Sequence, residues 1–188
     1  MNLMTFSSRR FLLRDRTSLS HARVEALVGS FDTLDAYRRY LRGTYVFRAA
    51  LDRSMSDFSW PAEFYAWQDA DDLSTLVLQD LWDLNVDVPP HHSSEPLLSD
   101  PETLFGTLYV VEGSSLGARI LYRRAQELGL SAEYGARHLA VQSASSDRWK
   151  QLIKLLDEAP HLDLDRTVRA SEATFAAVGR AFEELENA

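Results

Sequence analysis

Apolar residues recur at helical spacing along most of the chain, and glycine or proline marks the ends of the stretches. A run of strictly alternating apolar and polar residues with hairpin turns is not found. The spacing predicts helices over residues 14–28, 33–51, 72–84, 101–128, 147–158 and 165–184. We therefore expect an all-α fold, a compact multi-helix bundle forming one domain over residues 1–188, with residues 1–12 as a frayed N-terminal segment.

The predicted helix over residues 101–128 contains glycine where a helix does not favour it. Gly106, Gly113 and Gly117 are spaced so that, at about 100° per residue, all three lie within a roughly 40° arc. Each interior glycine destabilises a helix by roughly 1 kcal/mol relative to alanine. The glycines therefore indicate that something must come close to the helix backbone on this face. It is either another helix or a flat ligand.

Composition and charge exclude several classes of protein. The chain has 188 residues and no cysteine, so disulfides and thiolate chemistry are absent. The N-terminal residues lack an apolar leader and no stretch is long enough to span a membrane, so we expect a cytoplasmic protein. The net charge of −8 argues against nucleic-acid binding. Residues 1–50 nevertheless carry nine arginines against four acidic residues, which is compatible with a small anionic ligand near that end.

Among the five histidines, His21 has the most informative position. The spacing places it on one helix face with Val24, Val28 and Phe31. Such a histidine alone is more often a core residue, but beside a ligand-facing glycine helix it becomes a candidate iron ligand. His138 could cap a helix or form a core hydrogen bond. The remaining histidines fall in predicted loops: His161 in one, and His91 and His92 in another, where both are expected at the surface.

Three segments resemble the bacterial haem oxygenase family. Residues 108–118, with Glu-Gly-Ser-x-Leu-Gly at their centre, resemble the distal helix of that family, and residues 17–28 resemble its proximal segment. Residues 133–140, followed by Trp149, resemble a later part of the family sequence. The order and spacing agree over most of the chain. The resemblance implies a helical bundle with haem held between a proximal and a distal helix.

The resemblance also implies roles for residues on the two haem-facing helices. It identifies His21 as the proximal ligand of the haem iron. It identifies Gly113 and Gly117 as the distal backbone that steers the reaction, with Ser114 beside them in the haem-binding segment. Glycine suits this task because its small cross-section lets the helix press on the ring without offering an acid or base.

Further residues match positions around the edge of the haem pocket. Tyr109 and Arg14 match positions that meet the haem propionates. Phe47, Arg137 and Trp149 match residues that line the pocket and its water network, with Arg137 helping to hold the water that delivers protons.

Two departures from the family pattern concern the orientation of the ring. Thr44 stands where a relative has glutamine, and residues 175–178 lack the tyrosine that touches a propionate in some relatives. The resemblance therefore leaves open which meso carbon is cut.

The implied activity is oxidative cleavage of haem to biliverdin, carbon monoxide and ferrous iron. Haem would be both cofactor and substrate, with O2 as oxidant and electrons from a reductase or ferredoxin-type partner protein. We expect a monomer. Two alternatives stay open at this point: a non-catalytic haem carrier or sensor with the same fold, and a helical bundle whose glycines serve helix packing alone.

Overall fold

A computed structural model describes residues 9–68, 72–90, 97–144 and 146–186. Throughout these ranges the regular structure is helical, and an isolated bridge between Ser131 and Gly135 is the extent of β pairing. The predicted all-α class is therefore confirmed. The helices are α1 (Arg9–Arg16), α2 (Ser18–Val28), α3 (Leu34–Ser56), a 3-10 turn (Ala62–Phe64) leading into α4 (Tyr65–Gln68), α5 (Leu73–Asp83), α6 (Pro101–Glu127), α7 (Arg137–Ala144), α8 (Ser146–Asp157) and α9 (Leu164–Glu186).

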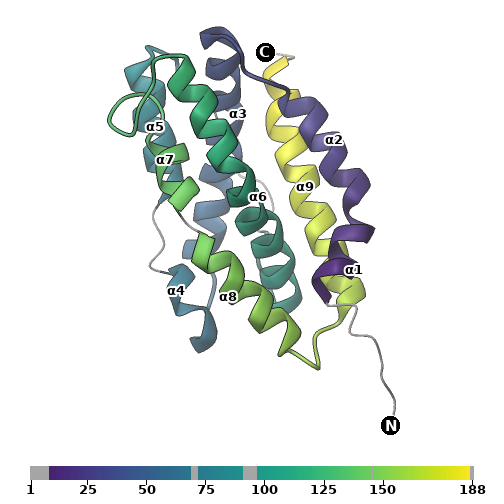
Figure 1. Ribbon diagram of the computed structural model, residues 1–188. Helices are drawn as coiled ribbons and strands as arrows, with labels where there is room; N and C mark the ends of the chain where they lie inside the picture. Colours follow the sequence, from purple (N-terminus) through teal and green to yellow (C-terminus); the bar gives the residue numbers. More distant parts are fainter. Residues whose placement is uncertain (1–8, 69–71, 91–96, 145, 187–188) are drawn as a thin grey trace.

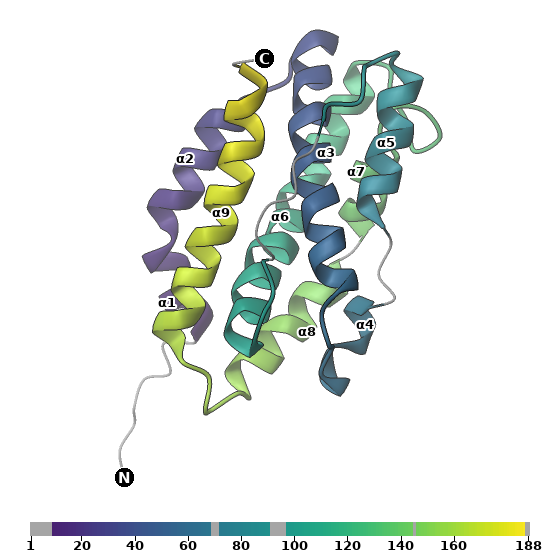
Figure 2. The ribbon, with the colours of Figure 1, turned by 180° about the vertical axis from the view of Figure 1, so that it is seen from behind.

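The long helix α6 lies at the centre of the bundle (Figure 1). It packs against α9 on one side, against α7 on another and against α8 near its first half. The view from behind shows α3 beside α9, with α5 on the outer side of α3 (Figure 2). Helix α2 lies along α9 at the edge of the bundle, so α9 separates α2 from α3.

Local signals in the sequence give the ends of the main helices. Asp100 caps α6 through a reciprocal capping box with Thr103, whose backbone N–H donates to the Asp100 carboxylate at 2.9 Å. Gly29 follows α2 with φ +67° and Gly129 follows α6 with φ +85°. Glycine adopts these left-handed conformations readily, which explains why both helices stop where the sequence predicted.

The N-terminal part of the chain differs from the expectation. Residues 9–12, expected to be frayed, form the first half of α1, and the Arg9 guanidinium donates to the carbonyl of Ala159. The predicted helix over residues 14–28 is two helices, because the chain breaks at Thr17. The Thr17 hydroxyl donates to the carbonyl of Leu13, at 2.8 Å, and both side chains are buried. The break sets α1 and α2 in different directions.

Two short helices have no counterpart in the predicted set. Helix α4 covers four residues and α7 covers eight, too few for a clear apolar period. Helix α7 is held from outside, since its first backbone N–H groups donate to the buried carboxylate of Asp80 on α5.

The apolar core lies on both sides of α6. One cluster joins α6 to α1 and α8 through residues such as Leu13, Leu108 and Leu152. A second cluster joins α3, α5 and α7, with Tyr37 and Leu81 fully buried. Because α6 contributes buried residues to both clusters, Leu108 to the first and Ala125 to the second, its position in the bundle is tightly determined. None of the described helices is both long and apolar enough to cross a membrane.

Candidate functional site

The glycines of α6 have two different environments. A Cβ atom added at Gly106 would lie 2.6 Å from the Cβ of Ala170 and 2.7 Å from the carbonyl oxygen of Thr167, so this glycine allows close packing against α9. A Cβ at Gly113 would make only ordinary contact with the Trp149 ring, at 3.5 Å, and one at Gly117 would meet nothing within 4 Å. Helix packing therefore explains Gly106 and leaves the bare backbone at Gly113 and Gly117 unexplained.

The open part of α6 is flanked by apolar groups. Leu116 and Ile120 are more than half exposed, unusual for large aliphatic side chains one turn apart on a central helix. Ser114 is exposed; its hydroxyl donates to the Val111 carbonyl at 2.7 Å and accepts from Gln142 at 2.8 Å. Around Gly117, α6 thus presents the exposed side chains of Leu116 and Ile120, with Arg119 exposed between them in the sequence, and no described side chain covers Gly117.

Helix α2 buries none of its residues. His21 lies on it with its side chain 58% exposed, and its ring meets Phe175 of α9 edge-on with centroids 5.8 Å apart. Its Nδ1 lies 3.4 Å from a carboxylate oxygen of Glu25, one turn further along. Its Nε2 has no partner in the described part of the chain. Phe31, expected on the same face, lies beyond the end of α2 and is buried in the core.

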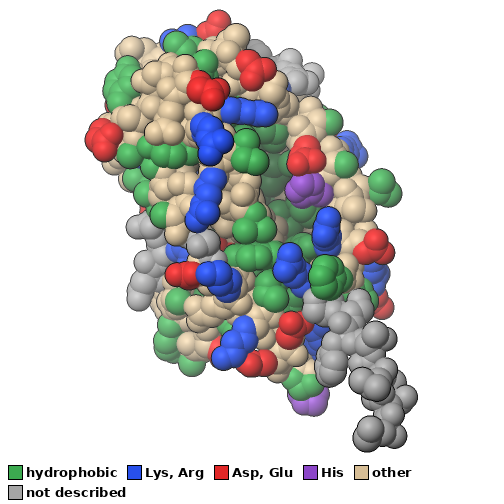
Figure 3. Space-filling view, in the orientation of Figure 1, with side chains coloured by type: hydrophobic (Ala, Val, Ile, Leu, Met, Phe, Trp, Pro, Cys, Tyr) green, Lys and Arg blue, Asp and Glu red, His purple; other side chains and the backbone are tan. Residues whose placement is uncertain are grey.

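A hollow separates α2 from α6 on the side of the molecule shown in Figure 3. Both helices pack against α9, which lies behind the hollow. Hydrophobic side chains are exposed along it, and Lys and Arg side chains gather around its rim. An apolar hollow with a basic rim suits a flat, apolar ligand that carries negative groups at one edge.

The rings of Tyr109 and Trp149 contact each other close to α1. Their rings pack with centroids 5.6 Å apart, and the Arg10 guanidinium lies over the Trp149 ring at 5.7 Å. Burial raises the pKa of Tyr109, while the charges of Arg10 and Arg14 and the Thr17 hydroxyl oppose that shift. Arg14 itself is exposed. The structure thus brings Tyr109 together with Trp149, which lies against Gly113, and places the charge of Arg14 near Tyr109, while their roles in binding a ligand stay predictions.

Phe47 lies in the apolar contact between α3 and α9, 8% exposed, in a cluster with Leu51 and Ala181. The Arg48 guanidinium lies 5.9 Å from its ring centre. Arg48 is also buried, and burial lowers its pKa while the carboxylates of Asp52 and Glu112 oppose the shift.

Glu112, the acid that precedes Gly113, belongs to a second buried polar group. Its carboxylate accepts from the Trp67 indole at 2.9 Å and lies 3.5 Å from the Arg148 guanidinium. Burial raises the pKa of Glu112, against the effect of Arg148, Trp67 and Arg48. Sequence reasoning missed this group, although a charged residue inside the glycine motif was an available signal.

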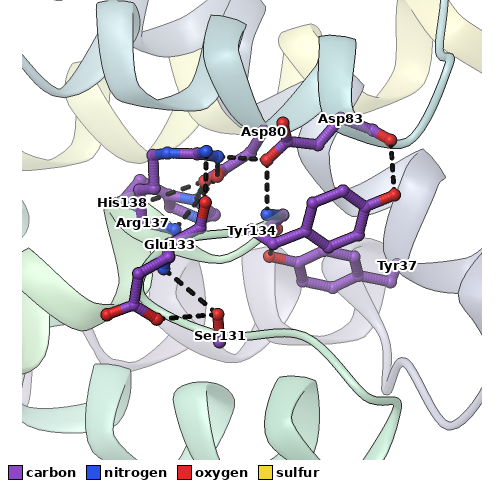
Figure 4. Close-up of polar contacts among 9 residues, drawn as sticks. Tyr37, Asp80, Asp83, Ser131, Glu133, Tyr134, Arg137 and His138 are labelled. Carbon is purple, nitrogen blue, oxygen red and sulfur yellow. Dashed lines mark hydrogen bonds and ion pairs between the residues drawn. The ribbon is translucent and has the colours of Figure 1, made fainter.

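Arg137 lies in an ion-pair cluster between α5 and α7 (Figure 4). Its guanidinium donates to the carboxylates of Asp80, at 3.2 Å, and Asp83, and to the carbonyl of Glu133. These contacts raise the pKa of Arg137, with Asp83 as the largest cause. The described contacts of Arg137 do not join it to Gly113 or Gly117, so its role in a water network stays a prediction.

His138 is a buried hydrogen-bonding residue, one of the two roles open to it from the sequence. Its Nδ1 lies 2.7 Å from Asp80, and its ring stacks on Tyr40 with centroids 5.9 Å apart. Burial lowers the pKa of His138, against the effect of Asp80, so the ring is held neutral with the proton on Nδ1. Asp80 was missed, yet its place on the apolar face with Val77 and Leu81 was a signal.

Of the three other histidines, the structure describes His161. His161 is exposed, while His91 and His92 lie outside the described residues. In the described ranges, no group of three or more His, Asp or Glu side chains is arranged to hold a metal ion. His21, with its exposed ring and an Nε2 that lies outside the contact with Glu25, is the described histidine placed to meet a ligand from outside.

Comparisons with known proteins agree with the geometry. Residues 7–184 match the family model described as "Heme oxygenase". The chain is 35% identical over 149 residues to heme oxygenase PigA of Pseudomonas aeruginosa, covering 75% of this chain and 73% of that protein. Among solved structures, the NO- and CO-bound heme oxygenase of Neisseria meningitidis superposes with a TM-score of 0.73 at 24% identity, over 95% of this chain and 92% of the other. The last match concerns the fold.

Proposed function

Because this chain belongs to the haem oxygenase family, we propose that it binds haem in the hollow between α2 and α6 and cleaves it to biliverdin, carbon monoxide and ferrous iron. Haem would be both cofactor and substrate, consumed in each cycle together with O2 and electrons from outside. The observation that carries the proposal is the backbone of α6 that helix packing does not explain, open at Gly117 and in ordinary contact with the Trp149 ring at Gly113.

His21 fits the role of proximal ligand. A neutral imidazole binds iron through one nitrogen while the other donates to a partner that holds the ring in place. Here Glu25 lies near Nδ1, at 3.4 Å, and Nε2 is open. Phe175 braces one edge of the ring. Glu25 would thus fix the tautomer that leaves the lone pair on Nε2.

The second half of α6 fits the role of distal wall. At Gly117 the backbone can lie against a flat ring, since no described side chain comes within 4 Å of a Cβ built there, and at Gly113 the Trp149 ring makes the neighbouring contact, at 3.5 Å. Leu116 and Ile120 would lose their exposure against that ring, which turns an unfavourable apolar surface into a binding surface. The same face offers no acid or base that could contact the reacting atoms directly.

The rim fits the propionates. Arg10 and Arg14 stand at the end of the hollow where Tyr109 lies, and their charges suit two carboxylates. An apolar ring with carboxylates along one edge would therefore enter with that edge toward α1. With the carboxylate edge of the ring held toward α1, the position of the ring determines which of its other edges lies against Gly113.

Bound haem iron supplies the binding and reductive activation of O2. The chain excludes bulk water with the apolar wall of α6 and holds ordered water through polar groups, for which Arg137 and the buried Glu112 are the candidates. Electrons come from a separate reductase or ferredoxin-type protein, and the chain acts as a monomer.

Hemin titration followed by turnover tests the proposal. Added hemin should give a Soret band with a one-to-one endpoint, and ascorbate or a reductase in air should then produce biliverdin and carbon monoxide. A chain that gives the Soret band without product would be a haem carrier or sensor. A chain that gives no Soret band would contradict haem binding altogether and leave the glycines as packing residues.

A further inference from the structure

A cavity of about 520 Å³ lies at one end of the bundle, between the start of α3 and the end of α5. It is separate from the hollow between α2 and α6. One face of α3 lines it with Asp35, Arg38, Arg39 and Arg42, at positions i, i+3, i+4 and i+7. The chain at residues 84–86 forms the opposite wall. Three arginines against one acidic residue make the lining basic in a chain whose net charge is −8.

Arg42 contributes a donor that is not paired within the described part of the chain. Its Nε is buried and makes no hydrogen bond. A buried N–H without an acceptor is unfavourable, so such a group points to an acceptor that binds from outside. Asp35 is not that acceptor, because it pairs with Arg38 at 2.8 Å. The cavity therefore holds a cation that the protein's own carboxylates do not neutralise.

Arg39 links the cavity to α2. Its Nη2 donates to the carbonyls of Leu27 and Val28, both at 3.1 Å, and so caps the C-terminal end of α2. Helix α2 buries none of its own residues, so contacts of this kind matter for its position.

We propose that this cavity binds the oxyanion group of a small molecule, a phosphate or a carboxylate, on Arg42 and Arg38, and that binding there competes for Arg39 and loosens the end of α2. Leu84 and Val86 provide an apolar wall for the rest of the molecule. Binding of the anion is independent of the proposed function. An effect on haem affinity, through the helix that carries His21, rests on it.

Calorimetry on the apoprotein tests the site, with pyrophosphate as the phosphate probe and succinate as the carboxylate probe. One saturable site is expected for at least one of them, and the stronger of the two identifies the chemistry. Arg42→Gln should weaken binding about tenfold, the loss typical of one charge-assisted contact. Arg169→Gln, which removes an exposed arginine of α9 outside the cavity, should leave binding unchanged.

Asp35→Asn should change the affinity for the anion in the opposite direction to Arg42→Gln. Removing this carboxylate frees Arg38 and should strengthen binding several-fold, which a merely misfolded variant would not do. Equal affinity for the original chain and for Arg42→Gln, Arg169→Gln and Asp35→Asn, or no binding of either probe, would overturn the site.

Hydrogen exchange tests the link to α2. With the cavity saturated, amides in the last turn of α2 should exchange faster than in the anion-free apoprotein, while those in the middle of α6 should not change. Unchanged exchange in α2 despite saturable binding would reject the link. These measurements use apoprotein, so they test the anion site independently of haem binding. Either proposal can therefore be contradicted while the other is supported.

Discussion

At the scale of single residues, exposure distinguishes the candidate ligand from the structural histidine. His138 is buried, neutral and bonded to Asp80, so its ring serves the contact between α5 and α7. His21 is exposed beside a hollow, and within the described part of the chain its side chain makes one weak polar contact, to Glu25. A side chain with so few protein contacts is available to an external partner.

Replacement of His21 by alanine should remove the axial ligand with little effect on the apoprotein, because the side chain is mostly exposed. We expect loss of the histidine-ligated haem spectrum and of turnover, and recovery of both on adding imidazole. Optical spectroscopy and urea unfolding measure the two effects. If His21→Ala kept the histidine-ligated spectrum while His138→Gln lost it, the assignment of the iron ligand to His21 of α2 would be wrong.

Arg14→Ala should weaken haem binding several-fold, since an exposed arginine–carboxylate pair contributes on the order of 1 kcal/mol. The larger effect should be on the ratio of biliverdin isomers, because the propionate contacts orient the ring. Chromatography of the product measures this ratio. Arg16→Ala is the matched control, as Arg16 lies on the same helix but pairs with Asp165. An unchanged ratio and affinity in Arg14→Ala would exclude Arg14 from the site.

At the scale of elements, α6 combines a glycine that packs against another helix with glycines that packing does not explain. Gly106 contacts the backbone of α9, whereas the space at Gly117 is open. The same substitution at the two positions should therefore have opposite effects on the free energy of unfolding.

Gly106→Ala should destabilise the apoprotein by roughly 1 to 3 kcal/mol, because its Cβ would force α6 and α9 apart. Gly117→Ala should stabilise it by up to about 1 kcal/mol through helix propensity. Gly117→Leu should in addition lower haem affinity. Urea unfolding and hemin titration measure these effects. Equal destabilisation at both positions would mean that Gly117 also serves packing.

The junction of α3 and α5 should show a pH effect. Burial raises the pKa of Asp52 from 3.8 to about 6, with Arg48 opposing. Between these values the folded state holds more protons than the unfolded state, so raising the pH from 4 to 6 lowers stability, by about 3 kcal/mol at most. Asp52→Asn should remove this fall. The free energy of unfolding, measured with urea between pH 4 and pH 6, tests this. The same dependence on pH in the original chain and in Asp52→Asn would contradict the prediction.

At the scale of the whole molecule, the hollow leaves α2 as the least buried of the long helices. It packs mainly against α9, with further contacts to α1 and to Arg39, and none of its residues is buried. Haem between α2 and α6 would give α2 a second surface to pack against. Ligand binding stabilises the folded state by mass action, and the gain should be greatest where the ligand adds contacts.

Hydrogen exchange of the apoprotein should therefore be fast throughout α2 and slow in α6 and α9. Hemin should slow amide exchange strongly in α2 and hardly at all in α9. The melting temperature should rise as the hemin concentration is increased. Mass spectrometry of exchanged peptides measures this. Protection spread evenly over the chain, or confined to α5 and α7, would place the ligand elsewhere.

The sequence alone determined the features that depend on neighbouring residues. Helical spacing, the capping box at Asp100 and the positive φ at Gly29 and Gly129 are local, so the all-α class and the main helix ends could be predicted. The helix break at Thr17 and the short α7 could not, because a buried hydroxyl and the distant carboxylate of Asp80 decide them.

Tertiary structure alone decided what each candidate residue faces. Three glycines on one face look alike in the sequence, and only the approach of α9 shows that Gly106 packs while Gly117 stays open. The partners of Arg137 and the cavity around Arg42 depend likewise on helices far apart in the chain. Spacing predicts which residues share a helix face, but the surface opposite that face exists only once the helices have packed.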